Sequence, residues 1–265
     1  MQTGTDKAIP ATVRREIETR LDSIEQTYDV RILLAVESGS RAWGFPSPDS
    51  DYDVRFLYVR ARSWYLSLKP GRDVIETPIE DEIDLNGWDI RKALGLMLRS
   101  NAVVSEWIES PIRYRADHPV VARLSALADR AMDARGIAHH YANLGQNAAD
   151  RWLTDNGDVP VKKYFYALRP ALAIRCLRLN RDGRPPMDLQ TLVDRCALSE
   201  PMRDEITKLV EAKRRSNEQS NATRIAALDD LIRDELLRAG ELPVRETEPD
   251  VDIRADQLFL ELVNT

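Results

Sequence analysis

Apolar positions in the N-terminal third of the chain follow first a helical and then a strand period. Val13, Ile17, Leu21 and Ile24 recur at steps of three and four residues, which predicts a helix over residues 10–28. Four short segments rich in apolar and β-branched residues come next, bounded by turn residues. They predict strands over residues 31–36, 53–60, 73–77 and 81–86.

From residue 89 onward the apolar period is helical almost throughout. Helices are predicted over residues 89–99, 103–109, 119–134, 136–154, 160–181, 188–195, 200–215, 221–238 and 253–263. Residues 240–252, rich in Glu, Pro and Asp, have the composition of a mobile segment. Because a change of period marks a change of structural layer, we expect an α/β (α+β) fold. Its predicted parts are a head with a small mixed sheet (1–115), a mostly helical domain (116–240) and a C-terminal segment (241–265).

Candidate chemistry is concentrated in residues 39–56, GSRAWGFPSPDSDYDVRF. Gly39 accepts backbone angles that are closed to other residues and leaves room for a phosphate. The Ser40 hydroxyl and neighbouring N–H groups are suitable phosphate ligands. Asp51 and Asp53 are two residues apart, so on a strand both carboxylates face the same side. Hard oxygen donors of this kind suit one Mg²⁺ ion that also binds substrate phosphate, or a pair of such ions.

A structural explanation competes for the same residues. Asp, Ser, Pro and Gly favour turns, and Pro46, Pro48 and Ser50 indicate a loop here. A turn accounts for Asp49 and Ser50. It does not account for two acids at the head of an apolar strand directly after a Gly-Ser turn, and we therefore favour a functional site. Arg41, in the same turn, is a further candidate for phosphate contact.

The predicted helix over residues 160–181 holds a second group of candidates. Lys162, Tyr166 and Arg169 lie at steps of four and three residues and therefore on one face, while Lys163 reaches that face from its edge. Such a face suits triphosphate charge and stacking on a base. The alternative is a solvated cationic stripe whose aromatic residues pack in the core. Lys163, Tyr166 and Arg169 are our candidate nucleotide-binding residues.

Composition narrows the class of protein. The sequence has 44 acidic and 38 basic residues, which argues against a broadly basic nucleic-acid coat and confines any polynucleotide contact to a local surface. No apolar run is long enough to span a membrane and the N-terminus lacks the features of a signal peptide, so we expect a cytoplasmic protein without a membrane partner. Cys176 and Cys196 have neither disulfide nor zinc spacing, and we expect buried thiols.

Several segments resemble one known group of enzymes. Gly39-Ser40, the spacer, Ser50-Asp51-x-Asp53 and the following strand resemble the signature of the DNA polymerase beta-like nucleotidyltransferase superfamily. Within it, the chain is similar to a bacterial and phage family of predicted nucleotidyltransferases associated with RNA ligases and RNA repair. The segments that carry this similarity are GSRAWGF, SDYDVRF, GWDIRKAL, SNAVVSEWIESPIRY and KKYFYALRPALAIR.

The resemblance implies a polymerase-beta-like head with a third carboxylate on a later strand. We choose Asp84, because Ile83 and Leu85 flank it as they would a buried sheet acid, for the role of general base or second metal anchor. Residues 80–82 have the pattern of an exposed acidic turn. Asp89 is assigned to structure, because it stands where the N-cap of the next predicted helix is expected.

The implied reaction is transfer of a nucleoside monophosphate from an NTP to a hydroxyl, with Mg²⁺ (Mn²⁺ as an alternative) and release of pyrophosphate. Asp51, Asp53 and Asp84 are the implied catalytic and metal-binding residues, and an RNA end is the favoured acceptor. Three alternatives stay open: AMP transfer to a protein hydroxyl by an antitoxin or regulatory type of enzyme, modification of a small molecule such as an antibiotic, and a non-catalytic nucleotide-binding module. The sequence does not specify the base of the NTP, template use or oligomeric state.

Overall fold

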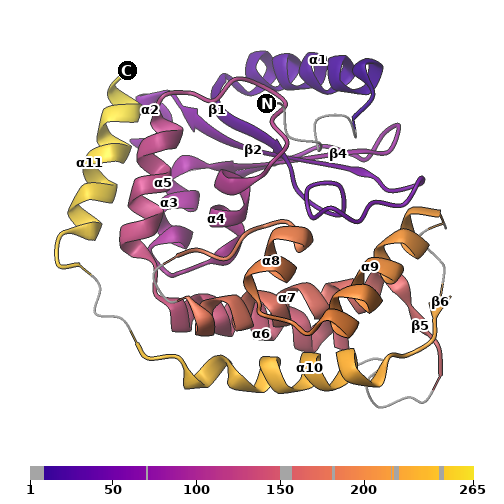
Figure 1. Ribbon diagram of the computed structural model, residues 1–265. Helices are drawn as coiled ribbons and strands as arrows, with labels where there is room; N and C mark the ends of the chain where they lie inside the picture. Colours follow the sequence, from indigo (N-terminus) through magenta and orange to yellow (C-terminus); the bar gives the residue numbers. More distant parts are fainter. Residues whose placement is uncertain are drawn as a thin grey trace. The chain divides into compact units, whose positions relative to one another are not determined.

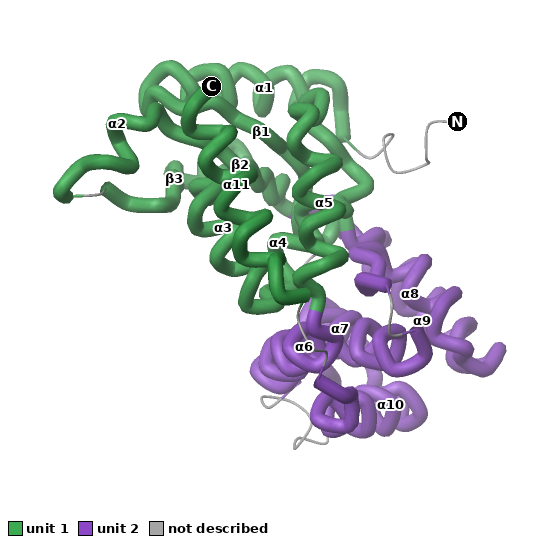
Figure 2. Tube along the Cα trace, turned by 90° about the vertical axis from the view of Figure 1, so that its left-hand side faces the viewer, with its two compact units in different colours: residues 1–42, 51–132, 247–265 green, residues 43–50, 133–246 purple. Residues whose placement is uncertain are grey.

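The computed structural model describes residues 9–69, 71–149, 157–180, 183–215, 217, 221–244 and 248–265. The chain forms two compact units, which Figure 2 distinguishes by colour. The first unit contains residues 1–42, 51–132 and 247–265, and the second contains residues 43–50 and 133–246. Each unit is therefore assembled from segments that are distant from one another in the sequence.

The first unit is built on a four-stranded mixed sheet (Figure 1). Its strands lie in the order β1 (Val30–Glu37), β2 (Tyr52–Arg60), β4 (Ile83–Asp89) and β3 (Val74–Glu76). β1 pairs antiparallel with β2, β2 pairs parallel with β4, and β3 pairs antiparallel with β4. The parallel pair needs a long connection, which contains the short helix α2 (Arg62–Tyr65) and strand β3.

Helices cover both faces of this sheet (Figure 1). The apolar stripe of α1 (Ala11–Tyr28) packs on one face, in a core that includes Val54 and Phe56 of β2. Leu57 and Val59 belong to the core on the other face. Alternate residues of β2 thus enter opposite cores, as the strand period requires. The helices of that second core are α3 (Ile90–Met97), α4 (Ala102–Glu109), α5 (Val120–Ala131) and α11 (Val251–Asn264).

The second unit is mainly helical. In the part of the chain that the structure describes, it contains α6 (Ala134–Ala149), α7 (Val161–Leu179), α8 (Leu189–Arg195), α9 (Glu200–Arg215), α10 (Ala226–Leu237) and the 3-10 helix η2 (Arg238–Glu241). Helix α7 is its centre, since most of its residues are buried and it contacts α6, α8, α9 and α10. Loop 43–50 belongs to this unit, where Phe45 stacks on Phe165 with ring centroids 4.4 Å apart.

The predicted fold class is confirmed: a head with a small mixed sheet and a mostly helical C-terminal part. Several boundaries differ from the prediction, and two of these differences have a clear physical reason. Strand β4 continues to Asp89, because Gly87 has no side chain and the Phe56 ring lies against its backbone. Helix α10 begins at Ala226 instead of residue 221, because β6 (Asn221–Ala222) pairs with β5 (Val159–Pro160). Parts of three predictions lie outside the described residues: the helix ends at 150–154 and 181, and residues 245–247 of the segment 240–252.

The predictions about Asp89, residues 80–82 and the two cysteines are also confirmed. The Asp89 carboxylate caps α3 by accepting the N–H of Arg91 at 2.8 Å. Residues 80–82 form an exposed turn, and Asp81 and Glu82 adopt φ values of 53° and 62°. Both cysteines are free and buried. Within the described chain, no helix is at once long and apolar enough to cross a membrane.

The compact units have different limits from the predicted domains. Helices α5 and α11 were assigned to the parts after residue 115, but both pack in the core of the first unit. Loop 43–50 was assigned to the head, but it belongs to the second unit. The physical reason is that an apolar helix face requires a covering partner, and its periodicity does not say which element that partner is.

Candidate active site

Asp53 and Asp84 lie side by side on two parallel strands. They are directly paired in the register of β2 with β4, and neighbouring strands are about 4.8 Å apart. Each acid stands between two buried residues of its own strand, so the strand period turns both carboxylates to the same face of the sheet. Their side chains are 30% and 27% exposed. The fold thus brings together two of the three predicted acids.

Asp51 directly precedes β2 and is exposed. Its carbonyl oxygen accepts a hydrogen bond from Arg41 Nε at 3.2 Å, and the next residue, Tyr52, donates its N–H to the Glu82 carbonyl at 2.8 Å. These bonds fix the backbone around Asp51 and leave its side chain accessible to solvent. The prediction placed Asp51 and Asp53 on one strand, but only Asp53 is within it, so the strand period does not orient the Asp51 carboxylate.

The Gly-Ser turn lies against Asp53. Gly39 has a φ of 134°, and a Cβ atom at this position would overlap the Asp53 carboxylate. Ser38 donates its N–H to the Asp53 carbonyl at 2.7 Å, while the Ser40 side chain is buried. Glycine is therefore required here for two reasons, its backbone conformation and the close approach of Asp53.

Arg41 connects this turn to the beginning of β2. Its side chain is 8% exposed and its guanidinium carbon lies 4.1 Å from the centre of the Tyr52 ring. Together with the bond to the Asp51 carbonyl, this stacking gives Arg41 a structural role. Contact between Arg41 and a nucleotide phosphate stays a prediction.

Arg55 joins the two paired acids. It stands two residues after Asp53 on the same face of β2, and one of its terminal nitrogens donates to Asp84 Oδ2 at 2.7 Å and to Asp53 Oδ1 at 3.2 Å. Among the residues that the structure describes, no three or more His, Cys, Asp or Glu side chains are grouped so as to hold a metal ion. In this arrangement the Asp53 and Asp84 carboxylates face a cationic side chain instead.

Glu37, at the end of β1, is a fully buried acid directly behind Asp53. Its Oε1 accepts the N–H of Asp53 at 3.1 Å and its Oε2 accepts the hydroxyl of Tyr114. Burial is the main cause that raises the pKa of Glu37 to about 7, and the Tyr114 bond opposes it. Glu37 therefore changes charge near neutral pH while bonded to the backbone of a candidate metal ligand.

The candidates on α7 lie in the second unit. Arg169 is 4% exposed and stacks on Trp43, with its guanidinium carbon 4.3 Å from the ring centroid. Tyr166 meets Trp43 edge-on at 5.2 Å, and Lys162 Nζ lies 6.0 Å from the centre of the Tyr166 ring. The predicted common face is therefore confirmed, with Lys163 half-buried beside it. Aromatic packing accounts for Arg169, and nucleotide binding by these residues stays a prediction.

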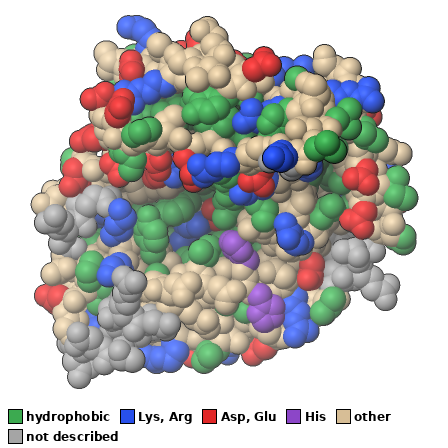
Figure 3. Space-filling model, turned by 180° about the vertical axis from the view of Figure 1, so that it is seen from behind, with side chains coloured by type: hydrophobic (Ala, Val, Ile, Leu, Met, Phe, Trp, Pro, Cys, Tyr) green, Lys and Arg blue, Asp and Glu red, His purple; other side chains and the backbone are tan. Residues whose placement is uncertain are grey.

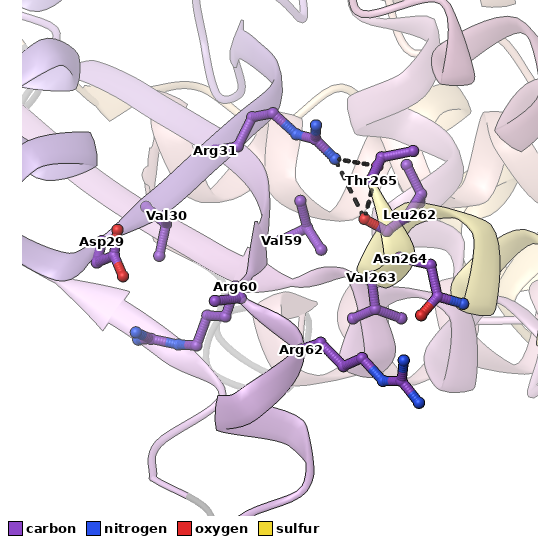
Figure 4. Close-up of a pocket in the computed structure, with 11 residues that line it drawn as sticks. Asp29, Val30, Arg31, Val59, Arg60, Arg62, Leu262, Val263, Asn264 and Thr265 are labelled. Carbon is purple, nitrogen blue, oxygen red and sulfur yellow. Dashed lines mark hydrogen bonds between the residues drawn. The ribbon is translucent and has the colours of Figure 1, made fainter.

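A cavity of about 500 Å³ opens at the end of β1 and β2 that is remote from the acids. Arg31, Arg60 and Arg62 line it together with the last residues of α11 (Figure 4). Arg31 donates to the Leu262 carbonyl at 3.2 Å, and the three guanidinium groups point in different directions. Because the cationic groups do not converge, we assign no substrate to this cavity.

Sequence reasoning missed Glu37, Arg55 and Tyr114. Glu37 is a lone acid at the end of an apolar run directly before the Gly-Ser turn, and a buried charge in such a run is a signal of function. Arg55 has the same strand period as Asp53, which was a second usable signal. Tyr114 lies 77 residues from Glu37, and no local pattern indicates their contact.

The chain is similar to known proteins over almost its whole length. A family model described as RNA repair pathway DNA polymerase beta family, named RlaP, matches residues 13–261. A protein of Bacillus subtilis (strain 168), described as uncharacterized protein YcgL, is 39% identical over 254 residues, which cover 96% of each chain.

Proposed function

The chain belongs to the RNA repair pathway DNA polymerase beta family, and from this premise we propose that it is a Mg²⁺-dependent nucleotidyltransferase. An acceptor hydroxyl oxygen forms a bond to the α-phosphorus of an NTP, the bond from that phosphorus to the bridging oxygen breaks, and pyrophosphate leaves. The observation that carries the proposal is the pairing of Asp53 with Asp84 beside the Gly39 turn.

The donor chemistry of these acids suits a divalent ion. Asp51 and Asp53 supply hard oxygen donors at the start of β2, and the lack of a side chain at Gly39 gives the Asp53 carboxylate the space that it occupies. Asp51 and Asp53 would hold Mg²⁺ or Mn²⁺. When bound, the ion would neutralise phosphate charge and favour ionisation of the attacking hydroxyl.

The other groups would bind the triphosphate, orient the acceptor and take up its proton. Backbone N–H groups of the turn at Gly39 and Ser40 donate to triphosphate oxygens in this proposal. Asp84 accepts the proton of the acceptor hydroxyl, which is the role of a general base. Phosphoryl transfer depends mainly on positioning and electrostatic stabilisation, and a rigid sheet that aligns two acids suits that requirement.

An RNA end is the proposed acceptor, and the family description supports it. Cationic and anionic side chains are interspersed on the face shown in Figure 3, and acids are in excess over the whole chain. RNA contact is therefore proposed to be local. A protein hydroxyl and a small molecule are the alternative acceptors that the experiment distinguishes.

The test is transfer of label from each of the four α-labelled NTPs, with Mg²⁺ or Mn²⁺, to RNA of defined ends and, in separate reactions, to protein and to small molecules that carry hydroxyl groups. We expect label in RNA, no transfer by Asp53→Asn, and full transfer by Asp81→Asn, the matched control in the exposed acidic turn. Label found in protein and not in RNA would identify a protein hydroxyl as the acceptor. Undiminished transfer by Asp53→Asn would refute the assignment of the acids, and an absence of label from every acceptor would refute catalysis and favour a binding module.

A further inference from the structure

Arg55 makes an unequal set of contacts at the paired acids. One terminal nitrogen donates to the Val54 carbonyl at 3.0 Å and to the Asp84 carbonyl at 2.9 Å. The other donates to Asp84 Oδ2 at 2.7 Å and to Asp53 Oδ1 at 3.2 Å. Arg55 therefore holds Asp84 through both its backbone and its carboxylate, whereas it holds Asp53 by one longer contact.

The charges explain why a cation is needed at this place. Asp53 and Asp84 are neighbours in register, so their carboxylates repel each other unless a positive charge offsets them. Arg55 is 18% exposed, and its partners keep about a quarter to a third of their side chains in contact with solvent. The acids therefore stay accessible while Arg55 neutralises part of their charge.

We propose that Arg55 is a positioning residue and an internal counter-cation of this site: it fixes Asp84 and competes with a divalent ion for Asp53. This inference rests on the proposed function, because it assumes that Asp53 is a metal ligand. Asp53 would exchange its longer contact with Arg55 for a divalent ion, whereas Asp84 would stay bound to Arg55. Arg55 then lowers the affinity of the acids for the free metal ion while it keeps Asp84 aimed at the acceptor.

The test compares Arg55→Gln, Arg55→Lys and Arg72→Gln in metal-stripped protein. Mn²⁺ binding is measured by electron paramagnetic resonance of the free ion, and unfolding is followed thermally with and without Mn²⁺. Arg72 is the matched control, because it forms an exposed ion pair with Glu76 beside the same sheet. The Arg55 guanidinium repels a divalent cation, and Arg55→Gln removes this repulsion. This variant is therefore expected to bind Mn²⁺ on the order of tenfold more tightly than the wild type.

The same variant is expected to unfold at a lower temperature without metal and to gain more from Mn²⁺ than the wild type does. A merely structural role would weaken metal binding, so the sign of the change discriminates. Arg55→Lys keeps the charge but one ammonium cannot make all the contacts of the guanidinium, so its Mn²⁺ affinity is expected between those of the wild type and Arg55→Gln. If Arg55→Gln does not fold, the Mn²⁺ affinity of Arg55→Lys is the test. The control Arg72→Gln is expected to behave as the wild type in both measurements.

Two negative results are distinguishable. Mn²⁺ binding that Asp53→Asn abolishes, but that neither Arg55 variant tightens, would overturn this inference and leave the proposed function standing. Mn²⁺ binding that is absent from the wild type and from every Arg55 variant would overturn both this inference and the metal dependence of the proposed function.

Discussion

Replacement of Glu37 by Gln is expected to change how the stability of the protein depends on pH. Glu37 is fully buried, and its carboxylate is bonded to the Asp53 N–H and the Tyr114 hydroxyl. Glutamine has nearly the same shape but no ionisable group, so it imitates the protonated acid. The comparison of the two proteins therefore isolates the proton on Glu37.

The magnitude follows from the raised pKa of Glu37. Burial raises this pKa from the ordinary 4.5 to about 7. Between these values the folded protein keeps the proton and the unfolded chain has released it, so the free energy of unfolding falls as the pH rises. One pKa unit corresponds to about 1.4 kcal/mol, so the interval between the ordinary and the raised pKa of Glu37 corresponds to about 3 kcal/mol. The free energy of unfolding of Glu37→Gln, relative to that of the wild type, should therefore rise by about 3 kcal/mol between pH 4.5 and 8.

Urea unfolding of both proteins at constant ionic strength, at four pH values from 4.5 to 8, measures this difference. Tyr114→Phe is the companion variant, because the Tyr114 hydroxyl stabilises the ionised carboxylate; its loss should raise the pKa of Glu37 further and move the window to higher pH. A stability difference between wild type and Glu37→Gln that is constant with pH, or that changes in the opposite direction, would refute the reasoning.

The remaining predictions concern three other positions. Gly39→Ala should lower the free energy of unfolding, measured by thermal unfolding, by about 1–3 kcal/mol and should abolish nucleotide transfer. Gly240→Ala is the control, because its added methyl group meets open space, and it should change neither property. Asp89→Ala removes the cap of α3 and should cost about 1 kcal/mol, measured by urea unfolding. Glu235→Gln leaves two arginines without their buried partner and should cost roughly 3 kcal/mol at pH 7. Because these arginines lower the pKa of Glu235, that cost should shrink as the pH falls below the ordinary carboxyl range.

Local patterns in the sequence located most of the fold. A helix or strand period is a property of a few consecutive residues, so the spacing of apolar positions was sufficient to predict the four strands of the sheet and the longer helices of both units, but not the short α2 and η2 or the pair of β5 with β6. The cap at Asp89 and the turn at residues 80–82 were predictable for the same reason, since each depends on contacts between close neighbours. Asp51 and Asp53 were found from their spacing behind a Gly-Ser turn.

The properties of the candidate site depend on distant contacts. Asp84 was chosen from its apolar neighbours and a resemblance, but only the parallel register shows that it pairs with Asp53. Arg55 contacts Asp84 across 29 positions of sequence, and Tyr114 contacts Glu37 across 77. Spacing along one strand could place Arg55 on the correct face, but it could not identify the acids that its guanidinium would join.

The sequence alone determined the kinds of element, their order and the residue types able to bind metal and phosphate, because these are written in short-range periodicity and side-chain chemistry. The tertiary structure decided which strands are neighbours, how deeply Glu37 is buried and that α11 completes the core of the first unit. The physical reason is that strand pairing and desolvation arise between segments far apart in the chain, and charge at a site is set by what surrounds it after folding.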